Sequence, residues 1–169
     1  MAKEFNLRPM LASDYPAVAK IFQQGIDGGN ATFEMEPPKW DRWDQDHFRI
    51  GRWVAVEVGT FEVVGWAALS FVSNRNVFRG VAELSIYIHN DYQSQGIGKV
   101  LMNKIIQDSE ENGIWMLQSG IFPENATSIH LHKKMGFREV GFREKIGQMP
   151  VSNIWRDILI VERRSRCID

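Results

Sequence analysis

The sequence is poor in the features that mark several large classes of protein. Its 169 residues include a single cysteine, Cys167, so no disulfide can form within the chain and a reducing compartment is expected. The formal net charge is only −1, which argues against a surface built for nucleic acid or an acidic membrane. No apolar run approaches the ~20 residues of a membrane span, and none follows Met1–Phe5 as in a signal peptide. We therefore expect a cytoplasmic protein that binds neither nucleic acid nor membrane.

The sequence also lacks the spacings of common metal and hydrolase sites. There are four histidines, His47, His89, His130 and His132. The last two stand two residues apart, whereas a ligand pair on one helix face requires a spacing of four. No Gly-x-Ser-x-Gly elbow is present. We therefore predict no metal site and no serine hydrolase.

Length and composition bound the architecture. A chain of 169 residues suffices for one ordinary domain and is too short for two. Hydrophobic residues make up 44% of it, enough for a full core. We expect a single domain over residues 1–169, with a core from about residue 4 to 162 and a short C-terminal tail.

Apolar periodicity divides this domain into strands and helices. Ser13 is the predicted N-cap of the first helix, and Gly136 is placed to end the fourth in a left-handed conformation. Strands outnumber helices, so we predict an α/β (α+β) fold with a mixed, mostly antiparallel sheet and helices on both faces. The expected helices lie at about 13–26, 40–48, 100–108 and 125–135, and the expected strands at about 5–9, 53–58, 61–72, 81–89, 114–121, 137–145 and 154–161.

The most informative segment is a strand that runs into a glycine turn and then a helix. Val81–His89 is followed by Asn90–Lys99 and by the helical pattern of Val100–Asp108. Gly96 and Gly98 remove side chains where this helix begins, and its first N–H groups have no partner inside the helix. Together with the helix dipole they offer a seat for an anionic phosphate. The segment predicts a phosphate-bearing ligand; a glycine turn without a ligand is the alternative.

Two familiar phosphate loops do not fit this segment. In a nucleotide hydrolase, Gly98-Lys99 would be followed by Ser or Thr to reach magnesium, but Val100 follows. A dinucleotide-binding fingerprint needs a third glycine where Leu101 stands. What remains is the pattern Gln-x-x-Gly-x-Gly over residues 93–98.

With its strand and helix, this pattern resembles the pyrophosphate loop of the GNAT acetyltransferases, (Arg/Gln)-x-x-Gly-x-(Gly/Ala), which holds acetyl-coenzyme A. A second segment, Glu124–Phe137, is similar to the fourth helix of that family. The two segments stand in the family's order and at about its spacing, and the resemblance spans nearly the whole chain. It implies a sheet of about seven strands and acetyl-CoA as the co-substrate, without a metal.

Within the family, the chain is most similar to the phosphinothricin and methionine sulfone acetyltransferases. The resemblance implies direct transfer of acetyl, in a ternary complex, to the α-amine of a small amino-acid analogue such as phosphinothricin, methionine sulfone or methionine sulfoximine. Acetylation of a protein N-terminus or a polyamine, and a non-catalytic acetyl-CoA-binding module, are the alternatives. Related enzymes pair their C-terminal strands across a two-fold axis, so a homodimer is expected. The match is carried by Thr32-Phe33-Glu34 with Glu36-Pro37, by Arg75–Phe78, by Glu83, and by Trp155-x-Asp157.

The resemblance also implies which residues meet acetyl-CoA. Backbone groups of Ile86, Tyr87 and Ile88 would pair with the pantetheine arm and polarise the thioester carbonyl. For the side chains of these residues, packing in the core is the better interpretation. Asn125 resembles the residue that contacts the arm. The pyrophosphate would lie on the amides of Ser94, Gln95, Gly96, Ile97, Gly98 and Lys99.

Two residues are candidates for catalysis. Glu83 is the predicted general base: alternation places it on the same face as Ser85 and Tyr87, and burial would raise the pKa of its carboxyl. The alternative is a carboxylate that reaches solvent or pairs with an arginine. His132 stands where many family members have a tyrosine and where the phosphinothricin subgroup also has histidine. Three roles are open for it: proton donor to the leaving thiolate, helper of the base, or packing.

Acceptor recognition is assigned to two segments. Arg75 suits a carboxylate or phosphinate through charge-assisted hydrogen bonds, with Arg79 as its competitor. Phe33 and Phe78 are predicted to wall the pocket, with core packing as the alternative. Glu34 is expected near the acceptor amine.

Overall fold

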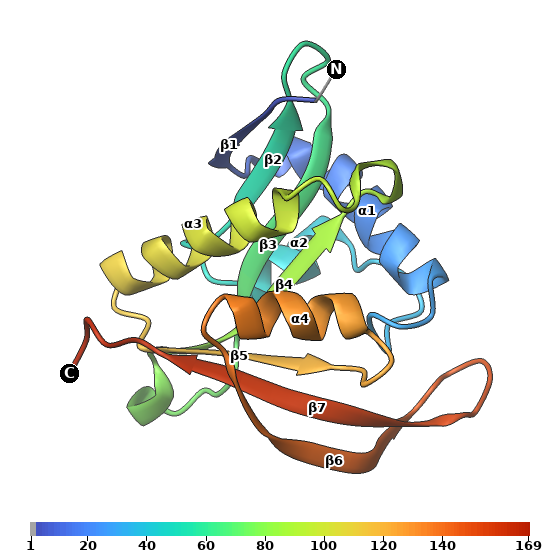
Figure 1. Ribbon diagram of the computed structural model, residues 1–169, viewed down its shortest axis with the longest axis vertical. Helices are drawn as coiled ribbons and strands as arrows, with labels where there is room; N and C mark the ends of the chain where they lie inside the picture. Colours follow the sequence, from blue (N-terminus) through green and yellow to red (C-terminus); the bar gives the residue numbers. More distant parts are fainter. Residues whose placement is uncertain (1–2) are drawn as a thin grey trace.

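A computed structural model describes residues 3–169 and places one sheet at the centre of the molecule (Figure 1). This sheet has seven strands in the order β1-β2-β3-β4-β5-β7-β6. Only β4 and β5 run parallel, and every other neighbouring pair is antiparallel. The predicted mixed, mostly antiparallel sheet of seven strands is therefore confirmed. The strands are β1 (Phe5–Pro9), β2 (Trp53–Glu57), β3 (Val63–Phe71), β4 (Val81–Ile88), β5 (Met116–Ile121), β6 (Arg138–Gln148) and β7 (Trp155–Arg164).

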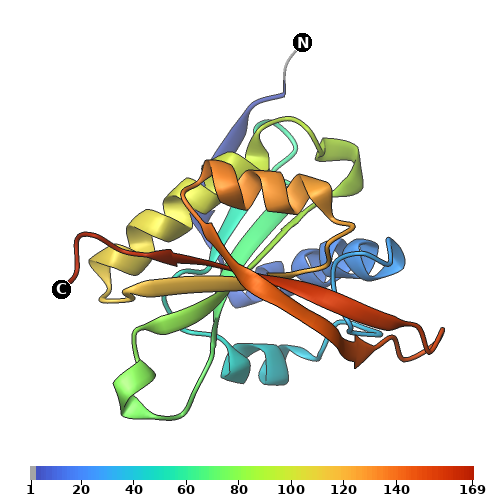
Figure 2. The same cartoon turned by 60° about the horizontal axis from the view of Figure 1, so that its bottom comes forward.

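Helices cover both faces of the sheet, with α3 and α4 on one side and α1 and α2 on the other (Figures 1 and 2). Alternation along β3 explains the division, because Trp66 and Ala68 pack with α1 and α2 while Ala67 and Leu69 pack with α3. Within residues 3–169, no helix combines the length and apolar character needed to cross a membrane. The helices are α1 (Tyr15–Asp27), α2 (Trp40–Asp46), α3 (Ile97–Glu111) and α4 (Ala126–Lys134), with short 3-10 segments η1 (Ala12–Asp14), η2 (Asn76–Phe78) and η3 (Asn90–Tyr92).

The start of α1 differs from the prediction. The N-cap position falls on Asp14, the last residue of the 3-10 segment η1, and not on Ser13. The Asp14 carboxylate accepts the Leu11 N–H at 2.7 Å and two hydrogen bonds from Arg8 at 2.7 and 2.8 Å. Asp14 therefore ties the approach to α1 to strand β1, a contact that the local pattern around Ser13 does not contain.

The ends of α3 and α4 depend on left-handed glycines. Gly96 has φ +82° and serves as the N-cap of α3, so this helix begins at Ile97, three residues before the predicted start. Gly136 has φ +88° just past the end of α4, as predicted. A residue with a Cβ is strained in this region of backbone space, which is why glycine stands at both positions.

Strand β4 is paired along its full length on one side and only in part on the other. On the β3 side the pairing continues to Ile88. On the β5 side it covers three pairs and stops at Glu83–Gln118. Beyond that point β5 continues along β7 and leaves β4. We call the resulting opening, between residues 84–88 of β4 and 119–121 of β5, the β4–β5 fork.

Candidate active site

A cleft of about 1530 Å³ opens at the β4–β5 fork. It is lined by β4, the glycine turn before α3, the first turns of α4 and the loop after α1. Pockets for a single small ligand usually measure ~300–1,000 Å³. The cleft therefore has room for a long ligand beside a second molecule.

The apex of the fork fixes the direction of the β4 backbone groups. The Ser119 hydroxyl donates to the Leu84 carbonyl across the fork, at 3.2 Å. Farther along the strand, the His89 N–H donates the opposite way, to the Val64 carbonyl on the β3 side, at 2.9 Å. Along an antiparallel strand the backbone groups of successive residues alternate between the two sides. The even-numbered residues of this stretch therefore face the fork.

By the same alternation, the N–H and C=O groups of Ile86 and Ile88 face the fork, where β5 no longer pairs with them. They are available to hydrogen-bond an extended ligand in place of a strand. The backbone groups of Tyr87 face β3 instead. The prediction that its backbone would meet acetyl-CoA together with those of Ile86 and Ile88 is thus corrected for Tyr87.

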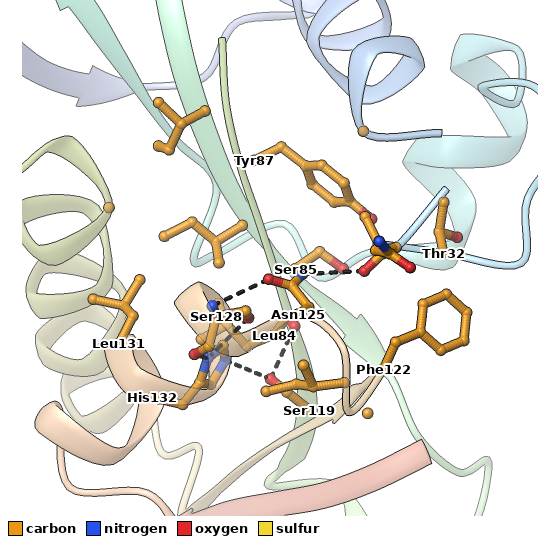
Figure 3. A pocket seen from close by; sticks show the side chains of 18 of the residues that line it. Thr32, Leu84, Ser85, Tyr87, Ser119, Phe122, Asn125, Ser128, Leu131 and His132 are labelled. Carbon is orange, nitrogen blue, oxygen red and sulfur yellow. Dashed lines mark hydrogen bonds between the residues drawn. The ribbon is translucent and has the colours of Figure 1, made fainter. Parts of the chain in front are cut away.

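Tyr87 contributes its side chain to the cleft. Its ring stacks on Trp66 at a centroid distance of 5.0 Å and meets Phe22 edge-on at 4.9 Å. Gly25 on α1 makes room for it, because a Cβ there would lie 2.6 Å from the ring. Burial raises the pKa of the Tyr87 phenol above its usual value, and hydrogen bonding with Thr32 opposes the shift. The phenol is therefore protonated, and Figure 3 shows it turned toward the side of the cleft that carries Thr32.

Glu83 lines the cleft at the last paired position of β4. Its side chain is exposed, whereas the prediction placed it in a buried environment. The argument from burial therefore does not apply to Glu83. A solvent-exposed carboxylate on the cleft wall is the arrangement observed.

The glycine turn suits an anionic group. Gly96 opens a helix of 15 residues, and among residues 3–169 nothing beyond its chain neighbours lies within 4 Å of the place that a Cβ would take. A Cβ on Gly98 would lie 3.1 Å from Leu131, so α3 and α4 approach closely at this point. Free N–H groups at the start of α3, with Lys99 beside them, fit a pyrophosphate.

The residues of the turn differ in how they can contribute. Ser94, Gly96, Gly98 and Lys99 line the cleft. The Gln95 side chain turns back to donate to the Asp91 carbonyl at 3.3 Å, and Ile97 is buried in the core. Gln95 and Ile97 can therefore offer only their backbone groups to a ligand.

His132 is buried and held at both ring nitrogens (Figure 3). Its Nδ1 lies 2.7 Å from the Ser128 carbonyl oxygen, and its Nε2 lies 3.1 Å from Ser119 Oγ. Burial lowers the pKa of the imidazole below its usual 6.5, against the opposing effect of the Ser128 carbonyl. The ring is therefore neutral near pH 7, and neither nitrogen is free to meet a thiolate.

Asn125 joins α4 to the loop after α1. Its Oδ1 accepts the Ser128 N–H at 3.2 Å, and its Nδ2 donates to the Asn30 carbonyl at 3.1 Å. Arg156 of β7 holds the same loop by donating to the Gly29 carbonyl at 2.9 Å and to Asn30 Oδ1 at 2.8 Å. We call the two contacts on Asn30 the Asn30 clamp.

The clamp positions the residues predicted to meet the acceptor. Phe33 and Glu34 follow Asn30 closely in the sequence, and both line the cleft. The Phe33 ring meets Phe122 edge-on at 4.9 Å and covers Gly147, where a Cβ would lie 2.6 Å from the ring. Arg156, whose guanidinium lies 4.0 Å from the Phe122 ring centroid, was not among the predicted residues. Its place between Trp155 and Asp157 in the family motif was the only available signal.

Arg75 and Phe78 are not brought to the cleft of their own chain. Both are exposed near η2, where the guanidinium lies 5.4 Å from the Phe78 ring centroid. Neither lines the cleft, and Figure 2 places this green segment far from α4 and the loop after α1. The cationic side chains that do line it are Arg42, Lys99, Lys134 and Arg143.

Among residues 3–169, no cluster of three or more His, Cys, Asp and Glu side chains is arranged to hold a metal ion. That the reaction proceeds without a metal stays a prediction.

A forked sheet beside a glycine turn at a helix N-terminus defines a class of protein that binds a long anionic ligand along an unpaired strand. The sequence profile of the Acetyltransferase (GNAT) family matches residues 16–137. The chain belongs to this family and is an acetyl-CoA-dependent N-acetyltransferase.

Named proteins similar to this chain include two bacterial enzymes. L-amino acid N-acyltransferase MnaT of Escherichia coli (strain K12) is 27% identical over 135 residues, 78% of each chain. An L-methionine sulfoximine/L-methionine sulfone acetyltransferase of Pseudomonas aeruginosa is 26% identical over 147 residues, 85% of this chain and 86% of that protein.

A solved structure extends the likeness to the cofactor. It is a GNAT superfamily phosphinothricin acetyltransferase from Sinorhizobium meliloti in complex with acetyl-CoA. It superposes with a TM-score of 0.83 at 26% identity, covering 97% of this chain and 89% of that one. The family and the subgroup suggested by the sequence motifs are thus confirmed.

Proposed function

We propose that this enzyme transfers acetyl from acetyl-CoA directly to the α-amine of a small amino-acid analogue, with phosphinothricin, methionine sulfone and methionine sulfoximine as the first candidates. The names of the relatives support this acceptor class. The observation that carries the proposal is an exposed carboxylate, Glu83, on the wall of the cleft that also contains the glycine turn and the unpaired β4 backbone.

The residues of the cleft divide the chemistry among them. Acetyl-CoA supplies the acyl group: the C–N bond to the acceptor forms, its C–S bond breaks, and CoA leaves as the thiol with the second proton that the attacking nitrogen loses. Glu83 takes the proton that the acceptor ammonium must lose before attack. One of the fork-facing N–H groups, that of Ile86 or of Ile88, stabilises the charge that develops on the acyl oxygen, and the other pairs with the extended arm of acetyl-CoA. The turn at Ser94–Lys99 holds the pyrophosphate.

Recognition of the acidic end of the acceptor is assigned to the arginines on the cleft. Arg143 of β6 and Arg42 of α2 line it, and a guanidinium binds carboxylate or phosphinate groups through paired hydrogen bonds. Arg75 takes part only if a second copy of the chain brings it to a cleft, as the expected homodimer allows. Exposed Phe142 and Trp155 on the β6–β7 hairpin offer apolar area for such a dimer.

The test is thiol release from acetyl-CoA with a panel of amines. The panel contains phosphinothricin, methionine sulfone, methionine sulfoximine, ordinary amino acids, spermidine and a peptide with a free N-terminus. A blank without amine corrects for the exposed thiol of Cys167. We expect turnover with the amino-acid analogues. Turnover only with the peptide or spermidine would replace the acceptor class, and acetyl-CoA binding with no turnover would favour a non-catalytic module.

The arginine assignment has its own control. Arg143→Gln is expected to raise the KM for the analogue with little change in the KM for acetyl-CoA. Arg138→Gln changes another exposed arginine of β6, paired with Glu162 and outside the cleft lining, and is expected to behave as wild type. A raised KM in Arg75→Gln but not in Arg143→Gln would move recognition to the 73–79 loop and so require a second copy.

A further inference from the structure

Ser119 stands at the point where the β4–β5 ladder fails. The last backbone pair is Glu83–Gln118, and the next residues are Leu84 and Ser119. In a continuous ladder a backbone N–H of β5 would satisfy the Leu84 carbonyl. Here the Ser119 hydroxyl donates to it at 3.2 Å, and Ser119 is 4% exposed. One side chain thus replaces the backbone hydrogen bond at the apex of the fork (Figure 3).

The protons available on His132 and Ser119 show that the Ser119 hydroxyl is the shared donor in a short chain of hydrogen bonds. The Ser128 carbonyl can only accept, so His132 Nδ1 carries the hydrogen in that 2.7 Å contact. A neutral imidazole with a proton on Nδ1 has a bare Nε2, which needs a donor. Ser119 Oγ lies 3.1 Å from it. The single hydroxyl hydrogen of Ser119 therefore serves two buried acceptors, the Leu84 carbonyl and His132 Nε2.

We propose that Ser119, oriented by His132, is a positioning residue that fixes the apex of the β4–β5 fork and thereby the placement of the fork-facing N–H groups of Ile86 and Ile88. The chain runs from the Ser128 carbonyl through His132 and Ser119 to the Leu84 carbonyl. It fastens α4 and β5 to β4 two residues before the first of these N–H groups. His132 acts through Ser119 in this arrangement and does not protonate the thiolate.

The inference rests on the family activity of acetyl transfer from acetyl-CoA and is independent of which amine accepts the group. Removing the Ser119 hydroxyl leaves two buried acceptors without a donor, which costs more than the loss of one surface hydrogen bond. The apex is then expected to loosen, and the ligand-facing amides lose their fixed spacing.

The experiment uses two serine variants of the full chain, without any acceptor. Ser119→Ala removes the bridging hydroxyl. Ser70→Ala is the matched control, because the Ser70 hydroxyl also donates to a β4 carbonyl, that of Glu83 at 3.5 Å, but on the side where β3 already pairs with β4. Calorimetric titration with acetyl-CoA measures the Kd. Nitrogen-15 relaxation of the Ile86 and Ile88 amides measures the order of the fork.

We expect Ser119→Ala to raise the Kd about fivefold to tenfold and to lower the order parameters of the Ile86 and Ile88 amides. Ser70→Ala is expected to match wild type in both readouts. Ser119→Thr, which keeps the hydroxyl, is expected to recover most of the affinity. If the threonine variant fails to fold, Ser119→Cys is measured in its place. An alanine variant with wild-type affinity and wild-type order parameters at Ile86 and Ile88 would overturn the proposal, as would a well-folded threonine variant no better than alanine.

His132 separates positioning from acid catalysis. Nitrogen-15 spectra of the imidazole should place its proton on Nδ1 in wild type and should shift Nε2 toward the unbonded range in Ser119→Ala. With whichever amine is turned over, His132→Gln, which keeps a polar group near Nε2, should retain more activity than His132→Leu. A proton found on Nε2, or equal loss of kcat in both variants with an unchanged acetyl-CoA Kd, contradicts the positioning role.

Discussion

The two halves of strand β4 both combine apolar and polar residues, but they differ in how their backbone groups are paired. Val81–Glu83 is paired on both sides, with β3 and β5, so its backbone N–H and C=O groups are used in the hydrogen bonds of the sheet. Leu84–Ile88 is paired with β3 alone, so every second residue directs its N–H and C=O into the cleft. A strand becomes a binding site when a neighbour leaves it. The paired half supplies rigidity and the unpaired half supplies hydrogen bonds.

The largest effect is expected at the border between the halves. Glu83→Gln removes the proposed base and should lower kcat by about 10²-fold or more. Its side chain is exposed, so the variant should fold as wild type. Thiol-release kinetics and a melting curve check both points. Glu62→Gln alters another exposed glutamate, outside the cleft, as a control. Unchanged kcat in Glu83→Gln would remove the base from this strand.

Next in size is a change that strains the paired half alone. A Cβ at Gly80 would lie 2.1 Å from the Trp115 ring. The clash would fall beside the Gly80 carbonyl, which accepts hydrogen bonds from the N–H groups of Trp115 and Met116. Gly80→Ala should lower the free energy of unfolding by about 1–3 kcal/mol. The acetyl-CoA Kd of the folded protein should stay unchanged.

Urea denaturation and calorimetry measure these two quantities. Gly28→Ala is the control for stability, since its Cβ would make only ordinary contacts, the nearest at 3.5 Å. A weakened Kd in Gly80→Ala would mean that the two halves of β4 are mechanically coupled.

A smaller effect is expected from a change beneath the unpaired half. Gly25→Ala would place a methyl group 2.6 Å from the Tyr87 ring, so the ring would have to shift within the cleft. We expect kcat/KM for the acceptor to fall about tenfold, equivalent to ~1.4 kcal/mol. The change in stability should be small because alanine favours the helix by about 1 kcal/mol over glycine. Steady-state kinetics and urea denaturation test this, and a large stability loss with normal kinetics would contradict it.

The smallest effect concerns pH. Burial holds the pKa of His132 below 6.5, so the unfolded chain binds more protons than the native one just below that pH. The free energy of unfolding should therefore fall as the pH drops below about 6.5, and His132→Gln should lessen the fall by about 1 kcal/mol or less. His47, whose pKa burial also lowers, contributes in the same direction. Denaturation at several pH values, with the exposed His130→Gln as control, measures the difference.

The sequence predicted those features that are encoded locally. The strand, glycine turn and helix over residues 81–108 and the left-handed Gly136 all follow from short patterns. The exposure of Glu83 could not be predicted, because alternation gives a face of the strand and does not say where the neighbouring strand stops. The direction of the Tyr87 backbone depends on the same information. Ser119 carries no local signal and Arg156 only its place in the family motif, since the partners of both side chains lie far away in the chain.

The Asn30 clamp gives the cleft an order of assembly. Arg156 and the Asn30 side chain that it binds are 126 residues apart in the chain. By contrast, the strand, turn and helix of the cofactor side lie within residues 81–111. Contacts between distant residues require long loops to close and form late. During synthesis, the side of the cleft that carries Phe33 and Glu34 therefore cannot be completed until the last strand has been made, whereas the phosphate-binding turn needs only its near neighbours.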